Sequence, residues 1–428
     1  MVSAIDPPAV NGLKPLELTF NLPDGSTVVS IRSAHKAAFG AGDSTYHIYV
    51  RDEHIGTWFV DKNLIARVSP AQVLDERAEV DFVRRFETPA AITNGNEDNA
   101  EHAITATLEK LWISIYALWL LLHDLDVVPI VLPTHHTQGQ EYLVATGLAA
   151  PSPFGTTVGD DLQPHRVLLL AREPFWQGAG APDRLAWLRT RPEASISGFN
   201  GHLGVFASQQ SFTRKGNVCT THPLRPPKPA PGTVLYSRYI VELGQHLQIV
   251  HIDATNPLHF ATYCRWQNSD RVNHGWKERG PDSKHRAYLE SQRFDLHTMS
   301  CIFLWDGEPA GYCEVGWAKE DNTAPFVASN CNIHIGEFDQ NSHVLVGEEK
   351  FRGGKRYQAV ATSIKHLCFL RDPRTQQVIA EPRVDLSSVP IQARFLPQER
   401  KKRIQLPHKH AVLFALQRDR FFQEGHFY

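Results

Sequence analysis

Residues 350–357 read Lys350-Phe351-Arg352-Gly353-Gly354-Lys355-Arg356-Tyr357 and form a basic loop between a predicted strand and a predicted helix. Two adjacent glycines allow the backbone to curl, so that several N–H groups and the positive end of the following helix point at one spot. Arg352, Lys355 and Arg356 add positive charge there. Together these features favour binding of a pyrophosphate group. The glycine and lysine spacing of a Walker loop is absent, and the alternative is a solvated turn with scattered basic residues.

The segments around this loop alternate between strand and helix patterns. Strands are predicted at 246–252, 299–305, 311–318, 330–336, 377–381 and 410–417, and helices at 258–266, 281–294, 357–370 and from Ser387 onward. Asp253 or Thr255 is expected to cap the first of these helices. The order of elements resembles that of the acyl-CoA N-acyltransferases, in which the strand before the basic loop splays from its neighbour and admits a pantetheine arm.

A proline-rich stretch divides the chain. His222 to Gly232 holds five prolines within nine residues, which forbids a helix or a central strand and favours an extended, semi-rigid spacer. We therefore expect an N-terminal domain at 1–221, a linker at 222–232 and a C-terminal domain at 233–428. The N-terminal domain should be mixed α/β, because it shows a hairpin around Pro23-Asp24-Gly25, a helix at 104–122, and buried strands at 127–132 and 166–170.

Composition narrows the class of partner. The 428 residues carry a formal net charge of −2, with 42% hydrophobic and 21% charged residues, so we expect a soluble globular protein that binds small molecules, not nucleic acid or a membrane. The six cysteines form no CxxC pair, which is typical of reduced thiols in a cytosolic compartment. The N-terminus has no secretory pattern, the longest apolar run (115–122) is too short to span a membrane, and the sequence leaves a homo-oligomer open.

Two residues are candidates for acid–base chemistry. His334 lies in the predicted strand before the basic loop, where a histidine would stand beside a bound thioester and take a proton near neutral pH. Glu381 ends the strand at 377–381 and is followed by Pro382, which places it at the edge where open α/β sheets bind ligands. The alternatives are a structural histidine and a solvated strand-end charge.

Three further residues are candidates for substrate binding. Glu314 and Trp317 lie on opposite faces of the predicted strand at 311–318, and Trp276 lies in a loop of mixed aromatic and basic character. A glutamate facing a cleft suits a cationic substrate, although its default is an exposed sheet position. No metal site is expected, because the histidine clusters at 135–136 and 408–410 lack partners at ligand spacing, and no HExxH or GxSxG motif is present.

With these residues in place, the C-terminal half resembles the siderophore N-acyltransferases of the GNAT superfamily, which include hydroxylysine acetyltransferases and fungal hydroxyornithine transacylases. The resemblance covers about residues 245–420. It is carried by segments in family order: Arg265 to Val272 with Trp276 and Glu278, His285 to Leu289, Tyr312 to Asp321, Asn332 to Gly336, Arg352 to Gly354, and Val378 to Pro382. Leu386 departs from the pattern, because the family has an asparagine there.

The resemblance implies a fold and a set of roles. It implies two GNAT-like domains, the first degenerate and the second catalytic. His334 and Glu381 would line the acceptor site, and backbone N–H groups beside His334, at Ile333 and Ile335, would contact the thioester. Residues 352–356 would bind the CoA pyrophosphate.

The resemblance also implies an activity. The expected reaction is acetyl transfer from acetyl-CoA, as co-substrate and with no permanently bound cofactor, to N5-hydroxy-L-ornithine. A bulkier donor such as anhydromevalonyl-CoA is the alternative, and so is a non-catalytic CoA-binding scaffold. The last three residues, His426-Phe427-Tyr428, differ from the Ser-Lys-Leu type of peroxisomal signal, which favours the cytosolic acetyltransferase.

Overall fold

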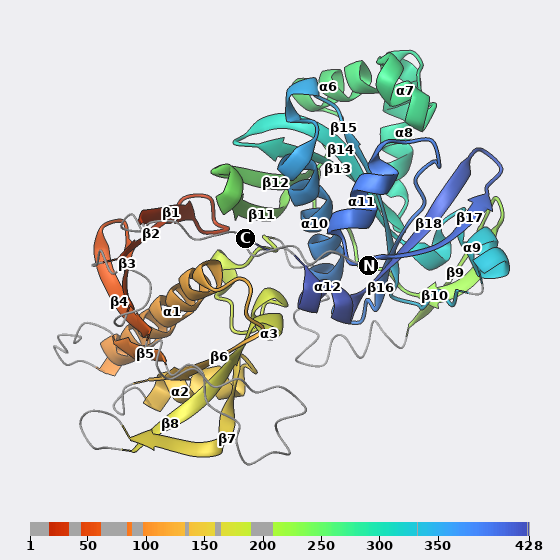
Figure 1. Ribbon diagram of the computed structural model, residues 1–428. Helices are drawn as coiled ribbons and strands as arrows, with labels where there is room; N and C mark the ends of the chain where they lie inside the picture. The colour runs from red at the N-terminus through yellow and green to blue at the C-terminus, as the bar shows by residue number, and fades with distance from the viewer. Residues whose placement is uncertain are drawn as a thin grey trace, which may run out of the picture. The chain divides into compact units, whose positions relative to one another are not determined.

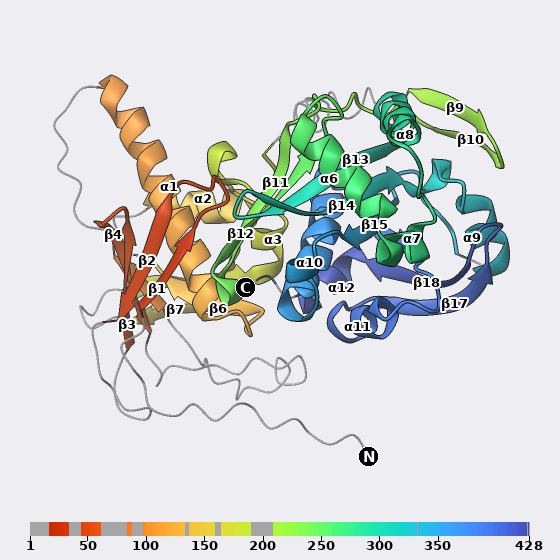
Figure 2. The same ribbon diagram turned by 90° about the horizontal axis from the view of Figure 1, so that it is seen from above.

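The protein forms two compact units, each built on an eight-stranded sheet (Figures 1 and 2). The computed structural model describes residues 17–33, 44–60, 84–87, 97–132, 137–158, 164–189, 209–331, 333–425 and 427. The first unit comprises residues 1–22 and 26–182, and the second comprises 23–25 and 183–428. Within the described part of the chain, no helix is long and apolar enough to cross a membrane.

The first unit is organised around one long helix. Leu111, Trp112, Ile115 and Trp119 of this helix are buried, because apolar residues recur at three- and four-residue steps. Its elements are β1 (Glu17–Asn21), β2 (Val28–Ser33), β3 (Ser44–Val50), β4 (Glu53–Val60), β5 (Arg84–Glu87), the long helix α1 (Glu97–Leu121), β6 (Val127–Val131), α2 (Thr137–Ala145), β7 (Ala149–Val158), β8 (Pro164–Ala171) and α3 (Arg172–Trp176). The predicted hairpin, helix and two strands of this region are confirmed.

The second unit contains the loop that opened the sequence analysis. Its strands are β9 (Gln210–Lys215), β10 (Val218–Pro223), β11 (Val234–Ile240), β12 (Gln245–His251), β13 (Thr298–Trp305), β14 (Glu308–Trp317), β15 (Gln340–Val346), β16 (Gln377–Ala380), β17 (Glu399–Gln405) and β18 (His410–Gln417). Its α-helices are α6 (Pro257–Asn268), α7 (Asp270–Trp276), α8 (Asp282–Phe294), α9 (Ala324–Cys331), α10 (Gly354–Arg371), α11 (Ser388–Phe395) and α12 (Arg418–Glu424). Hairpin β9–β10 forms a separate two-stranded sheet.

The two large sheets have the same strand order. The first runs β1-β2-β3-β4-β5-β6-β8-β7 and the second β11-β12-β13-β14-β15-β16-β18-β17. In both, the fifth and sixth strands are parallel and the other neighbours are antiparallel. A long helix, α1 or α10, connects that parallel pair. The two sheets differ in the connection between their second and third strands. Residues 34–43 connect β2 to β3 and are fewer than the residues of α6 alone, whereas residues 252–297 connect β12 to β13.

Helices cover both faces of the second sheet. Figure 2 shows α6 and α8 on one side of the sheet and α10 on the other. Ile302, Leu304 and Tyr312 pack with residues of α6, α7 and α8 in one apolar cluster. Successive strand residues point to opposite faces, so Cys301 and Cys313 lie towards α10, whose side of the sheet also holds Cys368. The site described below therefore lies in a sheet that is packed on both sides.

Two local predictions were wrong. Asn256, not Asp253 or Thr255, caps α6, because its Oδ1 accepts hydrogen bonds from the N–H groups of Leu258 (2.9 Å) and His259 (3.3 Å). The predicted strand at 330–336 is absent, because α9 extends to Cys331 and the described residues from Ile333 to Gly336 are irregular. The strand that precedes the basic loop is β15.

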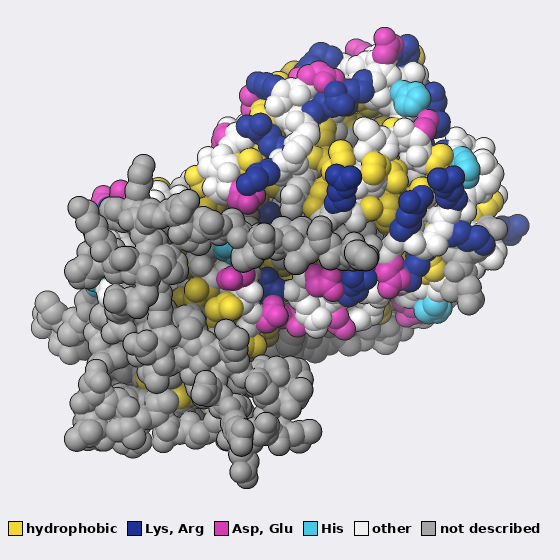
Figure 3. Space-filling view, viewed as in Figure 1, with side chains coloured by type: hydrophobic (Ala, Val, Ile, Leu, Met, Phe, Trp, Pro, Cys, Tyr) yellow, Lys and Arg dark blue, Asp and Glu magenta, His cyan; other side chains and the backbone are white. Residues whose placement is uncertain are grey.

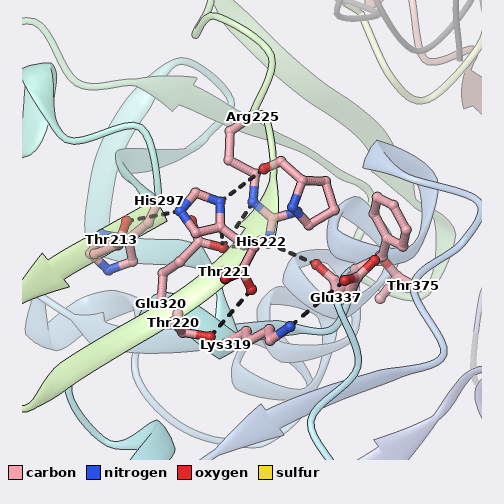
Figure 4. Close-up of polar contacts among 12 residues, drawn as sticks. Thr213, Thr220, Thr221, His222, Arg225, His297, Lys319, Glu320, Glu337 and Thr375 are labelled. Carbon is pink, nitrogen blue, oxygen red and sulfur yellow. Dashed lines mark hydrogen bonds and ion pairs between the residues drawn. The ribbon is translucent and has the colours of Figure 1, made fainter. Parts of the chain in front are cut away.

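The proline-rich segment is fixed to the second unit and does not separate the two units, which divide at 182/183. Arg225 is buried and donates from Nε to Oε1 of Glu320 (2.9 Å) and from a guanidinium nitrogen to the carbonyl of Glu337 (2.7 Å). Figure 4 shows this cluster, with His222 beside the same carboxylate. The prolines set an extended backbone, but this buried ion pair decides where the segment lies.

Replacing one partner of that pair should destabilise the second unit. Arg225→Ala leaves the Glu320 carboxylate buried without its cation, so we expect a loss of about 3–5 kcal/mol in the free energy of unfolding. Urea unfolding measures it. The double variant Arg225→Met, Glu320→Leu should recover much of the loss, because no charge remains buried.

Arg420→Ala is the control, since it removes an exposed pair with Glu424 (3.2 Å) and should leave the urea midpoint almost unchanged. A double variant as unstable as Arg225→Ala would show that the unpaired charge is not the cause of the loss.

Candidate active site

The two central parallel strands of the second sheet part soon after they meet. β15 and β16 pair only through Gln340 with Val378 and Asn341 with Ile379. On its other side β15 pairs with β14 along its whole length. The edge of β15 that faces β16 is therefore without a ladder partner from Ser342 onward. An opening of this kind leaves backbone N–H groups of a central strand available to a ligand.

His343 and Glu381 stand at this opening. Each lies two residues beyond the last paired residue of its strand, so the shared register brings them side by side. His343 Nδ1 lies 3.4 Å from Glu381 Oε1, and Lys409 Nζ lies 3.3 Å from the same oxygen. The Glu381 side chain is 1% exposed and that of His343 is 26% exposed. A carboxylate close to Nδ1 favours the tautomer in which Nδ1 carries the proton and Nε2 is the proton acceptor.

A buried cation lies behind the glutamate. Glu381 Oε2 is buried and makes no hydrogen bond to any described residue, and the same is true of Lys365 Nζ in α10. Burial lowers the pKa of Lys365 to about 8, and the negative charge of Glu381 partly opposes this shift. The carboxylate thus has a histidine and a lysine on its cleft side and a second lysine towards the interior.

A cleft of about 390 Å³ adjoins the pair. Its lining comes from segments far apart in the sequence, and five acidic residues, three histidines and three aromatic residues take part in it. Those used below are Lys215, Trp276, Tyr288, Asp295, His297, Glu314, Asp321, His343, Tyr357, Glu381, Arg383 and Lys409. Asp321 is ionised here, because His343 and hydrogen bonds from Thr323 lower its pKa against the opposing effect of burial. The cleft therefore suits a ligand that carries positive charge.

Glu314 is held at the cleft wall by two tyrosines. The hydroxyls of Tyr288 (2.6 Å) and Tyr312 (2.7 Å) donate to its Oε1. Burial, and then the Glu314 charge, raise the pKa of both tyrosines, so their hydroxyls remain donors. Glu314 is the register partner of His343 on the neighbouring strand. A carboxylate fixed in this way can bind a cationic group next to the imidazole.

The basic loop has the predicted position between a strand and a helix. Gly353 (φ +81°) and Gly354 (φ +50°) adopt left-handed backbone conformations that favour glycine, and no side chain caps the N-terminus of α10. Its first N–H groups are thus available to an anion. Arg352, Lys355 and Arg356 contact Glu349 (2.6 Å), Glu242 (3.1 Å) and Gln245 (2.9 Å), respectively. Figure 3 shows Lys and Arg side chains gathered over the region of α10 and α11, around hydrophobic surface.

Several predicted site residues lie elsewhere. His334 is exposed in the irregular segment after α9, where its carbonyl accepts from Gln377 Nε2 (2.7 Å), and it does not line the cleft. Ile333 and Ile335 pack against the apolar cluster of β17 and β18. Trp317 is 1% exposed. The guanidinium carbons of Arg225 and Arg371 lie 4.1 and 4.6 Å from the centre of its ring. Glu381, Glu314 and Trp276 do line the cleft.

The sequence contained a signal for His343. Ser342-His343-Val344-Leu345-Val346 runs almost directly into the basic loop and is rich in β-branched residues. A phosphate-binding loop follows its strand directly and opens the next helix. Residues 342–346, which lie nearer to the basic loop than residues 332–336, are therefore the better candidate for that strand. Asn332-Ile333-His334-Ile335-Gly336 alternates more regularly, which misled the prediction.

Comparison with known proteins identifies the fold and the family. A family model described as an acetyltransferase (GNAT) domain matches residues 256–394. An acyltransferase of Zymoseptoria tritici is 70% identical over 421 residues, which cover 96% of this chain and 98% of the relative. This chain belongs to the GNAT acyltransferases. The predicted GNAT-like α/β fold is confirmed, and acyl-CoA is the co-substrate of the enzyme.

More distant relatives give the branch of the family. A Beauveria bassiana protein named N(5)-hydroxyornithine:cis-anhydromevalonyl coenzyme A-N(5)-transacylase is 31% identical over 348 residues, covering 75% of this chain and 74% of the relative. An Omphalotus olearius acyltransferase is 45% identical over 416 residues, covering 97% and 96%. This GNAT acyltransferase thus belongs to the siderophore N-acyltransferase branch, as its sequence predicted.

Gly353→Ala tests whether the conformation of the basic loop contributes to acyl-CoA binding. A side chain at φ +81° costs about 1–2 kcal/mol, and relief of that strain would rotate the N–H groups at the start of α10. We expect the KM for acyl-CoA to rise about five- to thirtyfold, with kcat nearly unchanged, in a CoA-release assay.

Gly307→Ala is the matched control. Gly307 has the same φ of +81°, has open space at its Cβ position, and lies in the β13–β14 turn. Equal KM effects in the two variants would contradict a role for the loop conformation.

Proposed function

We propose that this GNAT acyltransferase transfers the acetyl group of acetyl-CoA to the hydroxylamine nitrogen of N5-hydroxy-L-ornithine. The product is a hydroxamate, the iron-chelating unit of a siderophore. The observation that carries the proposal is the His343–Glu381 pair (3.4 Å) at the opening between β15 and β16. The acidic and aromatic cleft beside the pair supports an acceptor of cationic character.

His343 is the proposed base, in place of His334. The hydroxylamine nitrogen attacks the thioester carbonyl carbon, and Nε2 of His343 takes the proton that the nitrogen releases. Glu381, whose Oε1 lies 3.4 Å from Nδ1, stabilises the imidazolium that forms. The C–S bond then breaks, and CoA leaves as a thiolate that takes up a proton to give the free thiol. Atoms and charges balance without a covalent acyl-enzyme.

The opening between the strands supplies the second element of the proposed mechanism. N–H groups on the unpaired edge of β15 would polarise the thioester carbonyl and stabilise the oxyanion. The pyrophosphate would lie at the start of α10, on the loop that follows β15, with Arg352, Lys355 and Arg356 around it. The donor would thus run along β15 from the basic loop to His343.

Glu314 and Trp276 are proposed to bind the acceptor. Glu314 keeps one carboxylate oxygen on Tyr288 and Tyr312, so its charge is fixed beside His343. Trp276 packs edge-on, with its ring 6.4 Å from the His343 ring, and closes this side. An α-ammonium group would gain from the carboxylate and from the aromatic face.

A bulkier acyl donor is the second candidate. The Beauveria bassiana relative is named for cis-anhydromevalonyl coenzyme A, whereas the Zymoseptoria tritici and Omphalotus olearius relatives are named only as acyltransferases.

The first unit is proposed to be a degenerate GNAT-like domain. Its sheet repeats the strand order, but residues 88–96, before α1, contain no Lys or Arg to replace the basic loop.

His343→Ala should lower kcat on hydroxyornithine by about 10²–10⁴-fold, because the general base is lost. Glu381→Gln should lower kcat as well, because an amide does not stabilise an imidazolium. His334→Ala is the matched control and should retain full turnover. The measurement is CoA release with acetyl-CoA and N5-hydroxy-L-ornithine. Full turnover by His343→Ala would contradict its role as the base. A loss of turnover in His334→Ala alone would assign the base to His334 instead.

The donor and acceptor are tested with substrate panels. Acetyl-CoA should give a higher kcat/KM than anhydromevalonyl-CoA, and the reverse preference would establish the bulkier donor. Ornithine should be a poorer acceptor than hydroxyornithine. Its alkylamine is mostly protonated at neutral pH, and the resulting ammonium group has no free electron pair with which to attack. Equal rates with both acceptors would exclude a hydroxylamine-specific enzyme.

A further inference from the structure

Hairpin β9–β10 contributes Lys215 to the lining of the cleft, although it precedes the residues 256–394 that match the GNAT domain. Figure 2 shows the hairpin beside α8. Lys215, the last residue of β9, reaches Asp295 at the end of α8, with 2.8 Å between Nζ and Oδ2. Both residues line the cleft. The cleft is thus completed by a segment outside the matched domain.

The hairpin is held in place from the other side. Arg225, just after β10, makes the buried ion pair with Glu320. The residues that follow Glu320 turn into the cleft, where Asp321 and Thr323 line it. Figure 4 shows Thr213 of β9 beside His222 of β10, with 2.8 Å between Thr213 Oγ1 and His222 Nε2. The position of Lys215 is therefore fixed at both ends of the hairpin.

Lys215 differs from the other cleft cations. Arg383 is occupied by Asp385 through two contacts of 3.1 Å, and Lys409 contacts Glu381 at the reacting pair. Lys215 has one carboxylate partner among the described residues, and its side chain is 61% exposed. An ammonium group has three donors, so Lys215 can bind a second anion without losing Asp295.

Asp295 is ionised and holds the Lys215 ammonium group at the cleft. Burial would raise its pKa, but His297, whose Nδ1 is 2.6 Å from Oδ1, and Lys215 lower it overall. The other carboxylates of the cleft would repel an incoming anion. Lys215 thus marks the place in an acidic cleft where a carboxylate can be accommodated.

The distance to the reacting pair fits an amino acid. Asp295 lies three residues and His297 one residue before Thr298, which is in register with Gly316, and Gly316 in turn is in register with Asn341. Thr298 is thus offset from His343 by two residues along the strand, about 6.6 Å, and by two strands across the sheet, about 9.6 Å, or about 12 Å in all. The three methylene groups between N5 and the α-carbon, the carboxylate beyond them and a hydrogen bond at each end give extended hydroxyornithine a comparable reach. The basic loop lies beyond the opposite end of β15.

We infer that Lys215 binds the α-carboxylate of the acceptor and so selects an amino acid over the corresponding diamine. The inference rests on the proposed function, because it takes the acceptor to be an N5-hydroxy amino acid whose α-ammonium Glu314 binds. Lys215 is a specificity residue and takes no part in proton transfer. The hairpin then determines which hydroxylamines enter the cleft.

The test compares N5-hydroxy-L-ornithine with N-hydroxyputrescine, which lacks only the carboxylate. Lys215→Ala should raise the KM for hydroxyornithine about tenfold, as expected for loss of one charge-assisted hydrogen bond at a partly exposed site. Its kcat, and its KM for N-hydroxyputrescine, should stay within about twofold of the wild-type values. Lys215→Arg should keep most of the wild-type selectivity, since the charge is retained.

Arg214→Ala is the control, because it removes a cation from the opposite face of the same strand. It should leave both KM values unchanged. Unchanged selectivity in Lys215→Ala, or an equal rise in KM for both acceptors, would overturn the inference while the proposed function stands. Absence of turnover by the wild-type enzyme with either acceptor would instead overturn the proposed function, and this inference with it.

Discussion

Two residue pairs hold β15 and β16 together, and the geometry of the site follows from the point where these strands part. Pro382 follows Glu381 and has no N–H group with which to extend a ladder. β16 remains fixed on its other side by four pairs with β18, up to Ala380. The divergence is thus built into a sheet that is otherwise continuous. It exposes backbone donors, and it places a histidine and a glutamate at the same depth.

The sequence predicted those parts of the fold that depend on local patterns. The basic loop was predicted because its glycines and basic residues lie within a few positions of one another. Glu381 was predicted because it ends a short apolar strand and is followed by a proline. Strands β12, β13, β14, β16 and β18 showed clear alternation or apolar runs. His343 was not predicted, because its placement at the site depends on which segment pairs with β14. Strand register is a property of distant segments, and regular alternation alone does not reveal it.

Three cleft residues, Lys215, Asp295 and Asp321, escaped prediction because their proximity also depends on distant segments. They come from a hairpin, a helix end and a turn that lie far apart in the sequence, and none belongs to a recognisable motif. The proline-rich segment gave a wrong domain boundary because prolines report backbone shape and not attachment. Arg225, placed among those prolines, was the informative residue, since a lone arginine in an apolar stretch needs a buried acidic partner.

The partners of the basic loop have a consequence for the catalytic cycle. Arg352, Lys355 and Arg356 each contact a glutamate or a glutamine. An arriving phosphate would exchange with these partners, so the net gain is the difference between two sets of contacts. In the proposed mode of donor binding, such exchange would limit how tightly the loop retains spent CoA. The carrier would leave after each transfer, and the side chains of the loop would return to their own partners before the next donor binds.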